Sequence, residues 1–112
     1  YVTQKTLRHL YAGARCVLFP SLYEGFGLPC LEAMKMGTPV LTSKVASLPE
    51  VCGDAAVYVD PFDVGSIHAG IVRIMTDAAL RGDLVEKGRL QAERFTAARY
   101  AEALTSAYQT LL

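Results

Sequence analysis

The sequence predicts an α/β fold, in which about three parallel strands form part of a Rossmann-like sheet with flanking helices. First, the 112 residues are 52% hydrophobic and 20% charged, a composition suited to one globular core. Second, short apolar runs alternate along the chain with segments of helical periodicity. Third, the connections between them are short, as in right-handed βαβ units. We therefore treat residues 1–112 as a single α/β unit.

A helix and a strand are expected at the start of the chain. Apolar residues at helical spacing predict a helix over residues 3–12, with Gly13 as its C-terminal stop. The apolar run 16–19 follows and ends at Pro20. Such a run predicts a buried strand of the kind that parallel sheets contain.

Two further strands are expected in the middle of the chain. Pro29 suits the first position of a second helix because its ring fixes φ at a helical value, and Gly37 is expected to end that helix. Residues 40–42 then predict a second strand, residues 47–50 a short helical turn, and residues 55–59 a third strand. The strands thus alternate with helices up to residue 59.

The remainder of the chain is expected to be helical. Asp63 is the predicted N-cap of a helix whose apolar stripe faces the sheet. That stripe is Val64, Ile67, His68, Ile71, Val72 and Met75. A further helix carries Leu80, Leu84, Gly88 and Phe95. Thr96 is the predicted N-cap of a last helix carrying Tyr100, Leu104, Ala107, Tyr108 and Leu111.

Charge and cysteine content exclude several classes of function. Eleven basic and eleven acidic residues give a net charge of zero, so no nucleic-acid partner is expected. The longest stretch without a charged residue, 103–112, is far shorter than the ~20 apolar residues of a membrane span. Cys16, Cys30 and Cys52 form no close pair, and no His lies near them, which favours reduced thiols in a cytoplasmic protein over disulfides or a metal site.

The loop between the first strand and the second helix has the composition of a ligand site. In open α/β sheets, ligands bind beyond the carboxyl ends of the strands. Gly25 and Gly27 allow a close approach to the loop backbone, and the following helix N-terminus favours an anion such as a diphosphate. The loop lacks the GxGxxG dinucleotide fingerprint and the lysine of a P-loop.

Two carboxylates, Glu24 and Glu32, flank this loop. An ionised carboxylate only accepts hydrogen bonds, so its natural small-molecule partners are hydroxyl groups. An anion site between two hydroxyl acceptors matches a nucleotide-sugar. Structural roles also remain open: Glu32 as a helix-dipole glutamate of the first turn, Glu24 as a solvated loop residue, and the glycines as parts of a tight turn.

The segment from Glu24 to Glu32, EGFGLPCLE, resembles the E-x7-E signature of family-4 retaining glycosyltransferases, which have the GT-B fold. The surrounding segments LYAGARCVLFPSLYEGFGLP, LEAMKMGTPVLTSKVASLPEV and GDAAVYVDPFD are also similar to that family. The resemblance covers nearly the whole chain. It implies that the chain is half of the C-terminal, donor-binding domain of a GT-B enzyme.

The resemblance implies a role for each residue of the motif. Glu24 corresponds to the catalytic-site glutamate that contacts hydroxyls of the donor sugar, and Glu32 to the glutamate that binds the ribose. The backbone that faces the sugar and diphosphate corresponds to Gly25, Phe26, Gly27 and Leu28. The resemblance further implies sugar transfer from a nucleotide-sugar donor with retention of configuration, and neither a cofactor nor a metal ion.

The resemblance also implies that other parts of a parent enzyme are required. The chain does not begin with Met, and we expect it to be a fragment. An N-terminal domain would supply the acceptor contacts, and a basic pair upstream of Tyr1 would clamp the diphosphate. The isolated chain is therefore expected to be inactive and to self-associate through an exposed sheet edge. The parent is expected in the cytoplasm or peripherally at the inner membrane face.

Two other functions remain open at this point. One is a non-catalytic α/β module that binds a nucleotide or phosphate. The other is a GT-B nucleotide-sugar epimerase. The basic clamp in a longer sequence would argue against the first, and the stereochemistry of the product would separate the second from a transferase.

Overall fold

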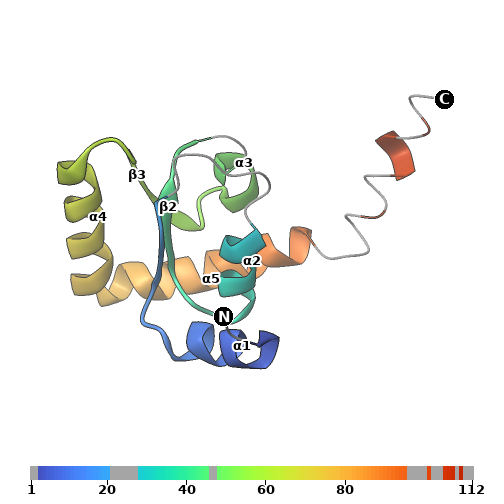
Figure 1. Cartoon of the computed structure of the whole chain (residues 1–112), viewed down its shortest axis with the longest axis horizontal. Helices are drawn as coiled ribbons and strands as arrows, with labels where there is room; N and C mark the ends of the chain where they lie inside the picture. The colour runs from blue at the N-terminus through green and yellow to red at the C-terminus, as the bar shows by residue number, and fades with distance from the viewer. Residues whose placement is uncertain are drawn as a thin grey trace.

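The computed structural model describes residues 3–20, 28–45, 48–95, 101, 105–107 and 109. Its centre is a parallel sheet of β1 (Val17–Phe19), β2 (Val40–Ser43) and β3 (Ala56–Val59), in the order β1-β2-β3 (Figure 1). Val17 pairs with Val40, and Leu41 pairs with Val57. The predicted α/β class and three parallel strands are confirmed.

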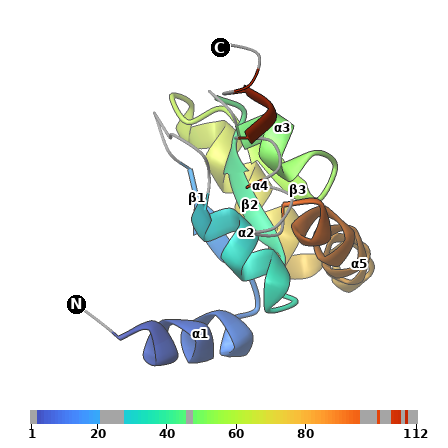
Figure 2. The same cartoon turned by 90° about the vertical axis from the view of Figure 1, so that its right-hand side faces the viewer.

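Helices cover both faces of the sheet. Their bounds are α1 Gln4–Gly13, α2 Leu28–Lys35, α3 Leu48–Cys52, α4 Val64–Thr76 and α5 Ala78–Arg94. Figure 1 shows α4 on one face, with α2 and α3 on the other. Helix α5 contacts α2, α3 and α4, while α1 packs beside α2 (Figure 2). No helix within the described ranges has the length and apolar character needed to cross a membrane.

The alternating side chains of the strands divide the core in two. The α2-side core contains buried side chains from α2, α3, β2, α5 and the residue before β3: Cys30, Leu31, Ala33, Met34, Val40, Leu48, Val51, Cys52, Ala55 and Ala92. The α4-side core contains Leu41, Val57, Val59, Ile74 and Leu84. The central strand β2 is buried along its whole length. The two cores thus meet at β2.

Two details of the predicted burial are wrong. The first strand was expected to be buried, but Leu18 is 45% exposed because β1 is an edge strand with only β2 beside it in the described sheet. In α4, Gly70 and Ile74 are the buried residues, and Ile67 and Ile71 of the predicted stripe pack against the α4-side core. The other members of that stripe are exposed: Val64, His68, Val72 and Met75.

The reason for the second error is the role of Gly70. A Cβ built at Gly70 would lie 2.5 Å from Cγ1 of Val59, so the absence of a side chain lets α4 approach the sheet closely. A pattern of apolar side chains cannot identify glycine as the contact point of a helix. Asp63 is the N-cap of α4, as predicted, and accepts hydrogen bonds from the N–H groups of Gly65 and Ser66.

The predicted last helix is described only in part. Residues 105–107 are helical, and Ala107 is exposed. The expected cap, Thr96, and the apolar residues Tyr100, Leu104, Tyr108 and Leu111 lie outside the described residues.

Candidate functional site

The structure describes only some of the predicted site residues. Glu24, Gly25, Phe26 and Gly27 lie outside the described residues. Leu28 is the first residue of α2, so its backbone, which the resemblance implicates, is at the helix N-terminus. The side chain of Glu32 is described, and it is half-buried.

The helix that carries Glu32 begins where the sequence predicts. Helix α2 starts at Leu28, with Pro29 as its second residue, and is the next described element after β1. The first turn of α2 contains no acidic residue. Because helix-dipole stabilisation falls off beyond the first turn, the dipole gives only a weak structural reason for a glutamate at position 32.

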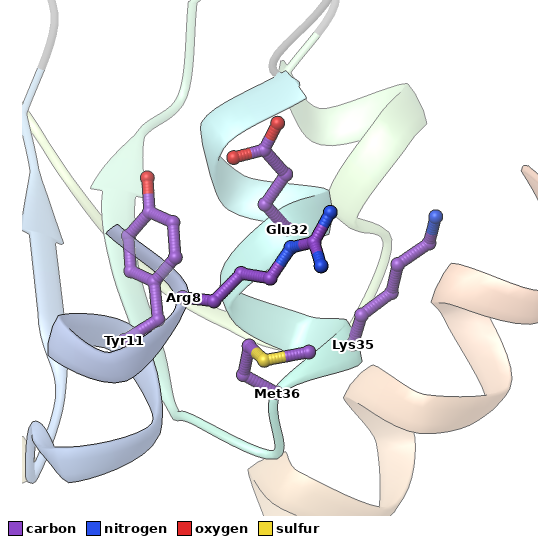
Figure 3. A pocket seen from close by; sticks show the side chains of 5 residues that line it. All are labelled: Arg8, Tyr11, Glu32, Lys35 and Met36. Atoms are coloured by element: carbon purple, nitrogen blue, oxygen red, sulfur yellow. The ribbon is translucent and has the colours of Figure 1, made fainter. Parts of the chain in front are cut away.

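Glu32 lines a pocket between α1 and α2 with a volume of about 340 Å³. The other side chains that line it are Arg8, Tyr11, Lys35 and Met36 (Figure 3). Arg8 and Tyr11 come from α1, and the other three residues come from α2. This volume is at the lower end of the range of small-molecule sites, which is about 300–1,000 Å³.

The pocket combines one carboxylate with two cationic side chains. None of the ion pairs among the described residues involves Glu32, Arg8 or Lys35. The Glu32 carboxylate therefore retains its capacity to accept hydrogen bonds from a ligand. Arg8 and Lys35 add positive charge at the same pocket, which suits a ligand that carries both hydroxyls and phosphate groups.

Tyr11 places a phenol hydroxyl at the same pocket. Burial, the negative charge of Glu32 and the neighbouring Cys30 thiol raise the pKa of Tyr11 above its ordinary value. The hydroxyl thus stays protonated at neutral pH and can donate as well as accept a hydrogen bond.

No motif in the sequence predicted a site role for Arg8, Tyr11 or Lys35. Tyr11 is one of the apolar residues at helical spacing that predict the first helix, and Arg8 lies downstream of Tyr1, whereas the basic clamp is expected upstream of it. A usable signal was present in the spacing: Arg8 precedes Tyr11 by three residues, and Lys35 follows Glu32 by three. Residues three apart share a helix face. What the spacing could not show is that these two faces meet.

The end of β1 is tied to the central strand by a side-chain hydrogen bond. The Thr42 hydroxyl donates to the carbonyl oxygen of Phe19 at 2.9 Å. Phe19 is the last residue of β1 and precedes α2 in the order of elements.

Among the described residues, no group of three or more His, Cys, Asp or Glu side chains could hold a metal ion. The expected independence from metal stays a prediction.

Comparison with known proteins identifies the family of this α/β chain. The model of the family "Glycosyl transferases group 1" matches residues 1–91. This chain belongs to that family, as the E-x7-E resemblance predicted.

Individual relatives agree with the family match. The chain is 45% identical over 111 residues to O-antigen chain mannosyltransferase B of Escherichia coli, covering 99% of this chain and 29% of that protein. It is 38% identical over 94 residues to the MMP alpha-(1->4)-mannosyltransferase of Mycolicibacterium hassiacum, covering 81% of this chain and 23% of that protein. The chain thus spans less than a third of the length of these relatives.

A solved structure supports the fold. Sucrose-phosphate synthase from Thermosynechococcus elongatus superposes with a TM-score of 0.85 and 31% sequence identity, over 98% of this chain and 28% of that one. The GT-B type of α/β architecture predicted from the sequence is therefore confirmed.

Proposed function

We propose that this chain forms part of the donor site of a retaining glycosyltransferase, which transfers a sugar from a nucleotide-sugar to an acceptor. The observation that carries the proposal is the position of Glu32. Its carboxylate lines a pocket between α1 and α2. Among the described residues, this carboxylate forms no ion pair. A carboxylate in that state accepts hydrogen bonds from hydroxyl groups, as a ribose would supply.

Each residue of the motif has a task in this proposal. Glu32 holds the ribose, and Glu24, eight residues earlier in the chain, holds hydroxyls of the donor sugar. The backbone N–H groups of Gly25, Phe26, Gly27 and Leu28 face the sugar and diphosphate. The positive end of α2 stabilises the negative charge that develops on the diphosphate as the sugar acquires oxocarbenium character. We propose that the reaction needs no metal ion.

The relatives suggest which sugar to test first. Two proteins named mannosyltransferases match this chain at 45% and 38% identity. We therefore propose a mannosyl group as the sugar transferred by the full-length protein. Transfer, rather than epimerisation, is the reaction that these names support.

The experiment uses the full-length enzyme that contains this chain. With Glu24→Ala and Glu32→Ala combined, we expect kcat/KM for sugar transfer to fall at least ~100-fold, because each hydrogen bond to a charged group contributes about 1.5–3 kcal/mol. Glu50→Ala, an exposed carboxylate of α3, is the matched control and should leave transfer unchanged. Unchanged transfer by the double variant would contradict the site assignment.

We propose that the isolated chain contributes only part of the donor site and has little activity by itself. Acceptor contacts and a basic diphosphate clamp would come from other parts of a longer enzyme. The thiol state of all three cysteines supports a cytoplasmic location for that enzyme.

Self-association of the isolated chain is a separate part of the proposal. Leu18 on the edge strand β1 and an apolar groove along α4 are exposed. These surfaces support pairing between copies. Light scattering across a concentration series should show a rising mass, and a constant monomer mass would contradict it.

A further inference from the structure

Tyr11 on α1 and Glu32 on α2 face the same pocket from opposite walls. In Figure 3, the Tyr11 hydroxyl and the Glu32 carboxylate point toward the same end of the pocket, whereas Met36 lies at the other end. The two side chains come from helices that β1 separates in the sequence. The pocket therefore holds two hydroxyl-binding groups of different chemistry.

The position of Tyr11 is held by contacts on its backbone and ring. The Thr38 hydroxyl donates to the Tyr11 carbonyl oxygen at 2.5 Å, and the Ala14 N–H donates to the same oxygen at 3.2 Å. The Tyr11 ring packs against the α2-side core. Thr38 lies between α2 and β2 in the sequence. Its hydrogen bond therefore connects α1 to the segment that joins α2 to β2.

The Tyr11 hydroxyl has no hydrogen-bond partner among the described residues, although its backbone carbonyl has two. Within the same part of the chain, the Glu32 carboxylate has no ion-pair partner. A carboxylate can only accept hydrogen bonds, whereas a phenol can donate one. Together they match a pair of adjacent hydroxyls, one of which donates while the other accepts.

We propose that Tyr11 and Glu32 bind the ribose diol of the donor at two points, Glu32 accepting from one hydroxyl and Tyr11 donating to the other. This inference rests on the proposed function, in which Glu32 meets the ribose. It adds Tyr11 as a binding residue and makes α1 the second wall of the ribose site. The chemical class recognised is a ribonucleotide rather than a deoxyribonucleotide donor.

The protonation state of Tyr11 agrees with this role. Burial and the charge of Glu32 raise the pKa of the Tyr11 phenol, so the hydroxyl keeps its proton near neutral pH. A protonated phenol beside an ionised carboxylate preserves the donor and acceptor pair that the diol requires.

The test uses the full-length enzyme with three donors: a nucleotide-linked mannose and its 2′-deoxyribose and 3′-deoxyribose counterparts. With Tyr11→Phe we expect kcat/KM for the ribose donor to fall about 3- to 10-fold, the effect of one neutral hydrogen bond. For the deoxy donor that lacks the hydroxyl contacted by Tyr11, the substitution should change nothing. The variant should thus discriminate less between these two donors than the wild-type enzyme does.

Tyr58→Phe is the matched control, because the Tyr58 hydroxyl donates to the Gly53 carbonyl oxygen at 2.5 Å and lines a different cavity. It should leave the discrimination between donors unchanged. Equal losses for all three donors with Tyr11→Phe would show a structural role and overturn the inference, as would no loss for the ribose donor.

Glu32→Gln separates the inference from the proposed function. If Glu32→Gln reduces transfer while Tyr11→Phe does not, only the role of Tyr11 is wrong. If Glu32→Gln leaves kcat/KM for the ribose donor unchanged, the proposed ribose site itself is wrong.

Discussion

The two faces of the sheet differ in how completely they are covered. On the α2 side, Cys30, Ala33 and Met34 of α2 are fully or almost fully buried against the strands, α3 and α5. On the α4 side, Ile74 is buried, but Val64 and Val72 of the same helix are exposed. Helix α2 is thus packed against several elements, whereas α4 contacts the sheet through a narrower face.

The difference shows what each face is suited for. Glu32 lies on α2 next to the buried residues Leu31 and Ala33, so its helix is packed firmly into the α2-side core. Such a well-packed support suits the role proposed for Glu32, in which its carboxylate binds ligand hydroxyls. The α4 side instead presents an apolar groove of about 440 Å³ lined by Val64, Ile67, His68, Ile71 and Val72. That surface is suited to contact with further protein.

The largest expected effect tests the packing difference directly. Met34→Ala should lower the free energy of unfolding by about 2–5 kcal/mol, because it removes a buried side chain and leaves a cavity between α2 and α5. Val72→Ala, at a position 47% exposed on α4, should change it by no more than about 0.5 kcal/mol. Urea denaturation of the chain measures both. Similar losses for the two variants would show that the faces are equally packed.

A smaller effect tests the narrow contact of α4 with the sheet. Gly70→Ala should lower the free energy of unfolding by about 1–3 kcal/mol, since the new methyl group would collide with Val59 and Leu41. Gly82→Ala in α5 is the matched control, because a Cβ there meets nothing within 4 Å. The control should raise stability by about 0.5–1 kcal/mol. Thermal unfolding of the two variants in parallel measures these changes. A shift of both melting temperatures in the same direction would contradict the prediction.

Local patterns in the sequence were sufficient for the order of elements. Pro29 lies within one residue of the start of α2, Gly37 follows the end of α2, and Asp63 caps α4. Each of these residues acts through its own backbone or through a neighbour only a few positions away. The E-x7-E motif likewise led to the correct family because it is a contiguous segment.

Features that depend on contacts between distant parts of the chain could not be predicted from the sequence. The exposure of Leu18 follows from the edge position of β1, which strand order determines. The pocket that Tyr11 and Glu32 share depends on how α1 packs beside α2, and the close contact of Gly70 depends on Val59 in another element. Of the site residues predicted from the motif, Glu32 is the one whose side chain the structure describes, since Glu24, Gly25, Phe26 and Gly27 lie outside the described residues.

The most direct test of the central claim is a crystal structure of the full-length enzyme with an intact nucleotide-sugar analogue. The account predicts that the Glu32 carboxylate lies within hydrogen-bond distance of a ribose hydroxyl, ~2.5–3.0 Å between oxygen atoms, while Glu24 contacts the sugar. A ligand bound away from the α1–α2 pocket, with Glu32 touching no part of it, would contradict the account.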